Sequence, residues 1–346
     1  MRRRRDWELM ATTTPTVRTG GRSILERSPS ARRADPIFRG TLMTLAALIL
    51  ALIAFFFVYL INKAEPALSH QGVFSFLFTN DWNPSKAIYG AWPLVVGTLI
   101  TAAIALVIGV PIAVATALYI TELAPRAVRS PLVILVELLA AVPSVVYGLW
   151  GIFVLIPKLK PAEQWFSDTF SFLPFVGGNV AGPNYFVAGL ILAIMILPIV
   201  SAISREVIST VPPDLKEASL ALGATRWEMI RMAVLPYSRS GITGAAMLGL
   251  GRAIGETIAV TLVIGNSPTI GKQLFDQGYT LAAVIANEFG EAANDKIHAG
   301  ALFAAGLVLF ILTLLINALA RGLVRRAERS SRPPTPVKAV NGTGAA

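Results

Sequence analysis

The sequence predicts an all-α membrane protein with six transmembrane helices. Of its 346 residues, 54% are hydrophobic and only 14% are charged, and the mean hydropathy is +0.64. A soluble domain carries about 25% charged residues, so this chain has too little polar surface to cover a globule in water. Six apolar stretches support the prediction, because each reaches the ~20 residues that cross about 30 Å of hydrocarbon. They span residues 40–61, 89–120, 131–156, 184–203, 240–264 and 299–320.

Residues 1–39, before the first apolar stretch, are predicted to form a disordered, basic cytoplasmic tail. They are rich in Ser, Thr and Pro, and four arginines follow the first methionine, a composition that cannot bury a core. The first apolar stretch starts too late and is too long for a secretory signal. Residues 326–346 are expected to be a second disordered cytoplasmic tail, which leaves 40–325 as the membrane domain.

The distribution of basic residues predicts the orientation in the membrane. Residues 1–39, 121–130, 204–239 and 321–346 hold 10, 2, 5 and 6 of the 30 Lys and Arg residues. The three loops on the opposite side hold six Lys and no Arg. Because cytoplasmic loops carry an excess of positive charge, both termini are expected in the cytoplasm of a multi-pass inner-membrane protein. The net charge of +10 therefore indicates anionic headgroups rather than nucleic acid as its counterpart.

Proline occurs inside several predicted spans. Pro143 lies in the middle of 131–156, and Pro198 lies inside 184–203. A proline within a helix leaves the carbonyl four residues earlier without its usual donor, so neighbouring helices or water must supply one. Kinked spans suit a pore that moves better than a rigid anchor, although proline is common in membrane helices generally.

Three ionisable side chains fall well inside predicted spans. Arg252 and Glu256 are four residues apart in 240–264 and are expected on one helix face near the membrane midplane. Glu137 lies inside 131–156. A charge at the membrane centre costs at least ~2.5–3.5 kcal/mol, so these residues are expected to face a partner or a water-filled path for an anion. A structural ion pair between two helices is the alternative interpretation.

The loop 204–239 contains two predicted short helices. Two prolines stop the preceding span, Asp214 is expected to cap a helix over 214–222, and Gly223 suits its left-handed end. A second helix, 226–234, is expected to end at the Leu-Pro that follows. The pair forms either a projecting knob or helices that lie on the lipid surface.

The residues of this loop resemble the EAA signature of bacterial binding-protein-dependent importer permeases. The matching positions are Glu217, Ala218 and Ser219, then Gly223, then Leu235 and Pro236. Ser219 replaces the second alanine of the signature, and Ala233 replaces its usual isoleucine. The resemblance implies that the loop docks into a groove of a cytoplasmic ATPase subunit and that these residues make the coupling contact.

Three further blocks, 82–122, 137–151 and 249–266, resemble phosphate-specific transport permeases of the PstC type. The resemblance covers about 40–325 and implies the type I ABC importer permease (MetI-like) architecture. It further implies that the chain forms half of a phosphate path in the bacterial inner membrane. The partners it implies are a related permease of the PstA type, two ATPase subunits and an extracytoplasmic phosphate-binding protein.

The sequence offers no catalytic constellation, metal site or cofactor motif. It has no Cys and only two His, and the stretch 265–273 misses the spacing of a phosphate-binding P-loop. A separate subunit is therefore expected to hydrolyse ATP. Three alternatives stay open: a permease for another oxyanion, a membrane-embedded enzyme that uses Glu137 or Glu256 on lipid, and a membrane sensor.

Overall fold

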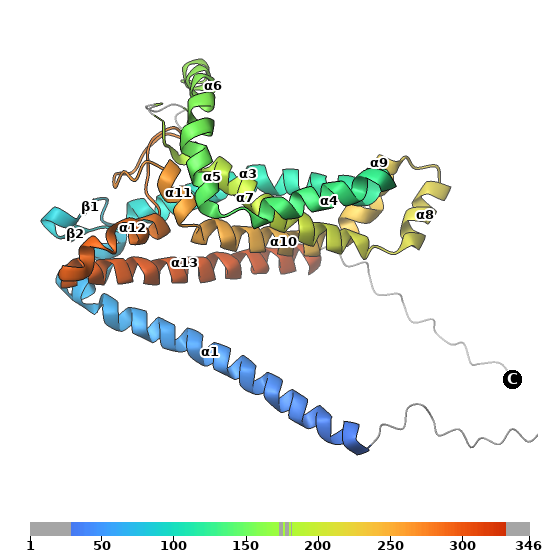
Figure 1. Cartoon of the computed structure of the whole chain (residues 1–346), viewed down its shortest axis with the longest axis horizontal. Coiled ribbons are helices and arrows are strands. Elements are labelled where there is room, and N and C mark those ends of the chain that lie inside the picture. Colours follow the sequence, from blue (N-terminus) through green and yellow to red (C-terminus); the bar gives the residue numbers. More distant parts are fainter. Residues whose placement is uncertain (1–28, 173–175, 177–179, 181, 330–346) are drawn as a thin grey trace, which may run out of the picture. The chain divides into compact units, whose positions relative to one another are not determined.

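The computed structural model describes residues 29–172, 176, 180 and 182–329, and these are almost entirely helical (Figure 1). Both predicted tails lie largely outside the described residues. The elements are α1 (Pro29–Gln71), α2 (Val73–Phe78), β1 (Trp82–Asn83), the 3₁₀ turn η1 (Pro84–Lys86), β2 (Ile88–Tyr89), α3 (Trp92–Leu118), the π turn η2 (Tyr119–Leu123), α4 (Arg126–Ala141), α5 (Ser144–Trp150), the π turn η3 (Gly151–Leu155), α6 (Ile156–Thr169), α7 (Tyr185–Ser209), α8 (Pro213–Ala221), α9 (Arg226–Met229), the π turn η4 (Ile230–Val234), α10 (Leu235–Gly255), α11 (Ile258–Val263), α12 (Leu281–Glu288), the 3₁₀ turn η5 (Glu291–Asn294) and α13 (Lys296–Arg329).

The chain divides into two compact units, residues 1–58 and 59–346. In the first, the described part of α1 exposes large apolar side chains, among them Leu48 at 64% and Phe55 at 65%. Such a surface is suited to lipid, because water-exposed helices place polar residues on their outer side. The second unit contains all other helices and the two-stranded antiparallel ribbon, in which Trp82 pairs with Tyr89.

Among the described residues, five helices are long and apolar enough to cross a membrane. They are Pro36–Gln71, Trp92–Leu123, Ser144–Thr169, Tyr185–Ser209 and Lys296–Gly322. The predicted span at 131–156 is divided between α4 and α5, and the one at 240–264 between α10 and α11. The first break agrees with the kink expected at Pro143, whereas the second, after Gly255, differs from the single helix expected over 240–264.

The core of the second unit forms around α7, which packs along α3 and α10. Within α7, Val187, Ile191 and Ile196 are fully buried. The helices approach closely where α7 carries Gly189, because a Cβ there would lie 2.5 Å from Ile104 of α3. Small residues permit this close contact between membrane helices, where packing rather than water exclusion drives association.

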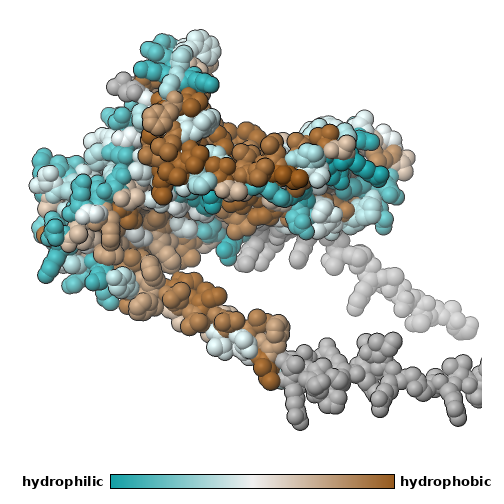
Figure 2. Space-filling view, viewed as in Figure 1, coloured by the Kyte–Doolittle hydropathy of each residue, from teal (hydrophilic) through white to brown (hydrophobic). Residues whose placement is uncertain are grey.

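The two ends of this bundle are polar and the middle is apolar. The loop helices α8 and α9 lie at one end, and the β-ribbon with α12 lies at the other (Figure 1). The space-filling view shows apolar residues gathered between these ends over the region of α3, α4 and α5 (Figure 2). A band of this kind, bounded by polar ends, fits a slab of hydrocarbon.

At the end of the bundle formed by the β-ribbon, Glu288 of α12 joins three segments. Its Oε2 accepts a hydrogen bond from Trp82 Nε1–H at 2.9 Å and lies 2.9 Å from His298 Nε2 of α13. Its Oε1 accepts from the Tyr279 hydroxyl at 3.4 Å. Burial raises the pKa of Tyr279 above its usual value, so this hydroxyl remains a donor at neutral pH. The carboxylate thus ties the ribbon, α12 and α13 together.

Candidate functional site

The break between α4 and α5 is built around Pro143, as the sequence predicts. Proline has no N–H, so the carbonyl of Leu139, four residues earlier, loses its helical donor. The hydroxyl of Tyr147 supplies the replacement by donating to Leu139 O at 2.7 Å, and the Val142 N–H lies 3.4 Å from the same oxygen. Tyr147 was missed by the sequence analysis, although a hydroxyl one turn after a mid-span proline is a usable signal.

Arg252 of α10 lies beside this break. It lines a cavity of about 40 Å³ together with Tyr147 and residues of α4 and α7. The other lining residues are Leu139, Ala140, Val142, Met195 and Ile199. Such a cavity has room for water, which needs roughly 10–15 Å³ and polar partners. Within the described part of the chain, Arg252 forms no ion pair, and its side chain is exposed.

Glu256 does not share a helix face with Arg252, contrary to the prediction. α10 ends at Gly255, and Glu256 has extended backbone angles of φ −71° and ψ 125°. The prediction assumed helical spacing through this point, and no proline marks the break. The next helix, α11, starts at Ile258 and packs on α5, where Gly148 lies against Ala259 and Leu262. The breaks of α4–α5 and α10–α11 therefore adjoin, with Arg252 next to both.

Glu137 has a partner other than Arg252. Its carboxylate lies 3.4 Å from the guanidinium of Arg205 on α7, with the Glu137 side chain 60% exposed. Arg205 is helical because α7 continues to Ser209, past the predicted end of its span at residue 203. An exposed pair of this kind contributes at most about 1 kcal/mol. The role of Glu137 in a substrate path stays a prediction.

The first loop helix, α8, begins one residue before the predicted range. Pro213 occupies the first turn, where a missing N–H costs no hydrogen bond, and Pro212 precedes it as N-cap. Asp214 therefore lies within the first turn and does not cap the helix, contrary to the prediction. Gly223 follows the helix with φ +86°, the left-handed conformation predicted for it. Glu217 and Ala218 are exposed on α8.

The second loop helix continues into α10. Thr225 caps α9 in a capping box: Glu228 N–H donates to Thr225 Oγ1 at 3.3 Å, and Thr225 N–H donates to Glu228 Oε2 at 2.7 Å. The Thr-x-x-Glu spacing is a recognisable sequence signal that the prediction overlooked. Leu235 and Pro236 do not end the helix as predicted. The π turn η4 leads directly into α10, with Leu235 N–H donating to Ile230 O, and Pro236 lies in the first turn of α10.

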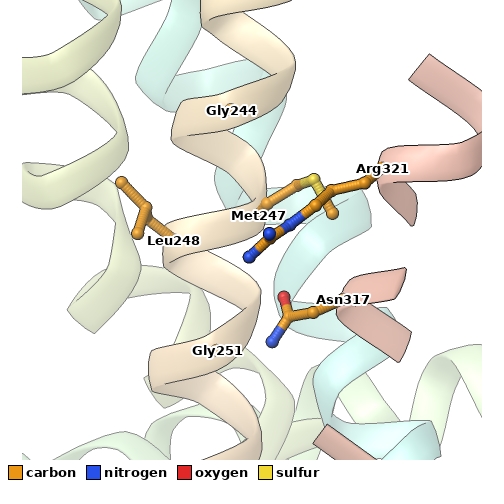
Figure 3. A pocket seen from close by; sticks show the side chains of 6 residues that line it. All are labelled: Gly244, Met247, Leu248, Gly251, Asn317 and Arg321. Atoms are coloured by element: carbon orange, nitrogen blue, oxygen red, sulfur yellow. The ribbon is translucent and has the colours of Figure 1, made fainter. Parts of the chain in front are cut away.

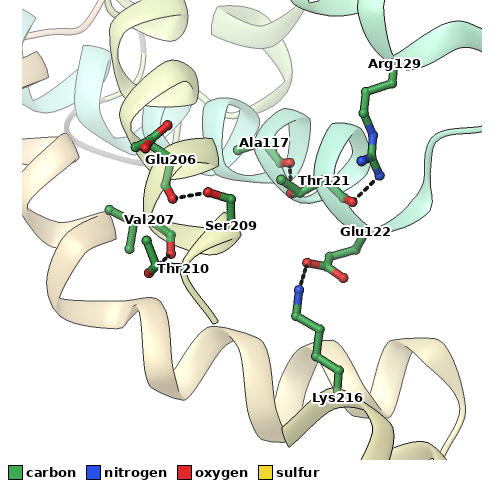
Figure 4. A network of polar contacts seen from close by, with 9 residues as sticks. All are labelled: Ala117, Thr121, Glu122, Arg129, Glu206, Val207, Ser209, Thr210 and Lys216. Carbon is green, nitrogen blue, oxygen red and sulfur yellow. Dashed lines mark hydrogen bonds and ion pairs between the residues drawn. The ribbon is translucent and has the colours of Figure 1, made fainter. Parts of the chain in front are cut away.

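Helix α8 is attached to the end of α3 by an ion pair. Lys216 Nζ lies 2.6 Å from Glu122 Oε1 of η2, and the two side chains are only 22% and 9% exposed (Figure 4). Beside it, Arg129 of α4 donates to the carbonyl of Thr121 (Figure 4). No local sequence pattern could reveal a pair 94 positions apart. The ion pair thus connects the loop to the end of α3, and Arg129 connects that end to α4.

The far side of the loop presents large apolar side chains. Leu222 is 90% exposed and Trp227 is 63% exposed, and Leu215 and Leu220 are also exposed. A cluster of exposed apolar residues is unusual on a soluble surface and marks a contact with protein or lipid. Across the described ranges, no group of three or more His, Cys, Asp and Glu could hold a metal ion.

Comparison with known proteins agrees with this arrangement. Residues 109–329 match the family model described as the binding-protein-dependent transport system inner membrane component. The phosphate transport system permease protein PstC of Mesorhizobium japonicum is 45% identical over 299 residues, which cover 85% of this chain and 91% of the relative. The chain belongs to the PstC family of permeases. A second PstC protein, from Xylella fastidiosa, is 42% identical and covers 91% of this chain and 96% of its own length.

The PstC assignment also agrees with the fold. A chain from the crystal structure of a bacterial alginate ABC transporter, in complex with its periplasmic protein, is 19% identical and superimposes with a TM-score of 0.56. The match covers 85% of this chain and 97% of that one. The predicted fold class, an all-α membrane protein of the importer-permease type, is confirmed, with two of its six predicted spans broken. PstC proteins are permease components, so the expectation of a transport subunit agrees with the family.

Proposed function

We propose that this PstC-family chain is a permease subunit of an ATP-driven phosphate importer and forms half of its translocation path. The two PstC relatives are named as phosphate transport permeases. Arg252, at the adjoining helix breaks, is the residue proposed to face the transported anion. Glu256 and Glu137 are proposed to line the same path, where a nearby carboxylate would keep the binding of an anion transient.

The exposure of Arg252 within a membrane helix carries this proposal. A permanently charged guanidinium facing hydrocarbon would be costly, so its surroundings in the assembled protein must be a partner or an aqueous path. Phosphate enters as a mono- or dianion, and removing its water in a low-dielectric medium requires compensating charge. The planar guanidinium fork matches phosphate oxygens, which an ammonium group does less well. The broken backbone nearby is consistent with a water-lined path, because irregular backbone at membrane depth needs such surroundings.

Coupling to ATP is proposed to run through the loop residues Glu217, Ala218, Gly223, Leu235 and Pro236. The exposed apolar side chains of α8 and α9 are suited to a groove on an ATPase subunit. From Arg226 the chain stays helical through η4 and α10 to Gly255, about 30 residues or ~45 Å. The α9 part of the proposed docking surface, with Leu235 and Pro236, therefore belongs to the same continuous helix as Arg252, which can transmit a displacement.

The proposed assembly contains this chain, a related permease of the PstA type, two ATPase subunits that hydrolyse ATP, and an extracytoplasmic phosphate-binding protein. Both termini are proposed to lie in the cytoplasm of a bacterial cell, with residues 40–325 as the permease domain between two tails. The loop 204–239 then faces the ATPases.

The substitution Arg252→Gln tests the path. Uptake of radiolabelled phosphate should fall by at least about tenfold, since charge-assisted hydrogen bonds contribute about 1.5–3 kcal/mol each. The complex should still assemble and hydrolyse ATP, and Arg252→Lys should recover little uptake. Arg126→Gln, which removes a charge from exposed α4, is the matched control. Full uptake by Arg252→Gln, or by a protein with Arg252→Glu and Glu256→Arg together, would overturn the transport role.

A further inference from the structure

A second arginine lies in an open pocket between α10 and α13. The pocket has a volume of about 470 Å³ and is distinct from the cavity beside Arg252. Four residues of α10 form one wall, and Asn317 and Arg321 of α13 form the other (Figure 3). The α10 residues are Gly244, Met247, Leu248 and Gly251.

Two polar side chains line the pocket, and both carry N–H donors: the Arg321 guanidinium and the Asn317 amide. Asn317 and Arg321 are four residues apart, so they share one face of α13. Figure 3 shows the Arg321 guanidinium reaching toward α10 and the Asn317 amide pointing into the same space. Among the side chains that the structure describes, residues 36–172, 176, 180 and 182–322, no carboxylate lines the pocket, and Arg321 has neither an ion pair nor a hydrogen bond. Within that part of the chain, no negative charge compensates the guanidinium of Arg321.

The α10 wall leaves room for a ligand. A Cβ at Gly244 or Gly251 would meet nothing within 4 Å. Because these two positions are seven residues apart, both face the pocket, and the absence of side chains lets a ligand approach the helix closely. Gly244 lies eight residues before Arg252, which is about 12 Å along the helix toward the loop end of the bundle.

We propose that this pocket binds a phosphate group, held by Arg321 and Asn317. A guanidinium and an amide supply the planar, donor-rich surface that tetrahedral oxyanions require. The group can come from free phosphate that has passed Arg252, which rests on the proposed function, or from a phospholipid headgroup. With free phosphate, the pocket is a second station between Arg252 and the loop end of the path.

A cysteine-protection experiment reports directly on this pocket, because the native chain has no cysteine. In the full complex, purified in a phosphate-free detergent, the Met247→Cys variant is labelled with a neutral maleimide. The control variant is Leu314→Cys, which is exposed on α13 but does not line the pocket. Free phosphate in one arm, and phosphatidylglycerol in mixed micelles in the other, are added at rising concentrations.

We expect one of the two probes to slow labelling at position 247 but not at position 314. Adding Arg321→Gln should weaken that protection by at least about tenfold, whereas Arg126→Gln should leave it unchanged. Gly244→Leu, which fills the pocket, should slow labelling without any probe, and Gly322→Leu, next to Arg321 but outside the lining, should not. Protection by phosphate identifies the transported anion as the ligand, and protection by phosphatidylglycerol identifies the headgroup.

If neither phosphate nor phosphatidylglycerol protects position 247, or if the protection survives Arg321→Gln, the phosphate-group site is contradicted. Phosphate uptake by the native complex from the same purification, after reconstitution into lipid vesicles, separates this result from a failure of the proposed function. An active complex without protection contradicts only the pocket. A native complex that assembles and hydrolyses ATP but takes up no phosphate contradicts the transport role.

Discussion

At the scale of single residues, the hydroxyl of Tyr147 compensates for the proline that breaks its helix. Tyr147→Phe removes the short hydrogen bond to Leu139 O and leaves this carbonyl with only the long contact from the Val142 N–H at 3.4 Å. We expect this to cost about 1–3 kcal/mol, lowering the apparent melting temperature and the phosphate uptake of the complex. Tyr119→Phe, on an exposed ring, is the control. Equal stability of the two variants in a thermal denaturation assay would contradict the assignment.

Glu228 gives the capping box of α9 a pH dependence. The Glu228 carboxyl accepts hydrogen bonds from the backbone N–H of Thr225, which has the larger effect, and from the Thr225 hydroxyl. Both hold the pKa of Glu228 below its usual 4.5. The carboxyl of Glu228 has a lower pKa in the folded protein than the 4.5 of the unfolded chain. The capping box therefore stabilises the fold at pH values above 4.5, and this stabilisation is lost as the pH falls through the pKa of the folded protein.

We therefore expect the amides of residues 225–229 to lose protection from hydrogen exchange at acidic pH in the native protein. In Glu228→Gln the protection should already be weak at neutral pH and should change little on acidification. Asp214→Asn, in the first turn of α8, is the control because Asp214 makes no cap. The same acid response in native protein and Glu228→Gln would assign the effect to another group.

At the scale of elements, the Lys216–Glu122 pair attaches the proposed docking helix to the bundle. Both side chains are largely buried, so removing one partner leaves an uncompensated charge. We expect Lys216→Met or Glu122→Gln to reduce ATP-driven phosphate uptake severalfold while ATP hydrolysis continues. Exchange of the two residues, Lys216→Glu with Glu122→Lys, should restore most of the uptake. No recovery in the exchanged protein would show that the charges act separately.

How far the sequence predicts these elements depends on where their stabilising contacts lie. The turn at Gly223 follows from local rules, since only glycine takes a φ of +86° without strain, and the break at Pro143 follows from the missing N–H. The break after Gly255 could not be predicted, because packing of α11 on α5 determines it. The continuation of the helix through Pro236 could not be predicted either, because the π turn before it has a hydrogen-bond geometry that the usual helix-breaking effect of proline does not indicate.

The same division applies to the proposed site. Arg252 can be identified from the sequence because a charge stands out in an apolar run. Its proximity to Tyr147 cannot be predicted from the sequence. Arg321 lies one residue beyond the predicted span 299–320 and was counted as one of the basic residues that mark the cytoplasmic side. Only the packing of α10 against α13 shows that its side chain reaches into a pocket.

At the scale of the whole molecule, the chain exposes Arg252 and is proposed to supply only one wall of a path. The isolated chain, reconstituted in lipid vesicles, should therefore pass no phosphate with or without ATP, whereas the complex with a second permease and two ATPases should. The flux of radiolabelled phosphate into the vesicles is measured for the isolated chain and for the complex. ATP-independent flux through the isolated chain would contradict a half-path and favour a self-sufficient channel.

The two adjoining helix breaks have a consequence for how such a protein can open. The segments beyond the breaks, α5 and α11, pack on each other, while those before the breaks, α4 and α10, both contact α7. Two of the helices are therefore interrupted at neighbouring points, whereas α3 and α7 continue past them. We therefore expect α5 and α11 to hinge together and change the width of one end of the proposed path, while the unbroken α7 holds the other end in place.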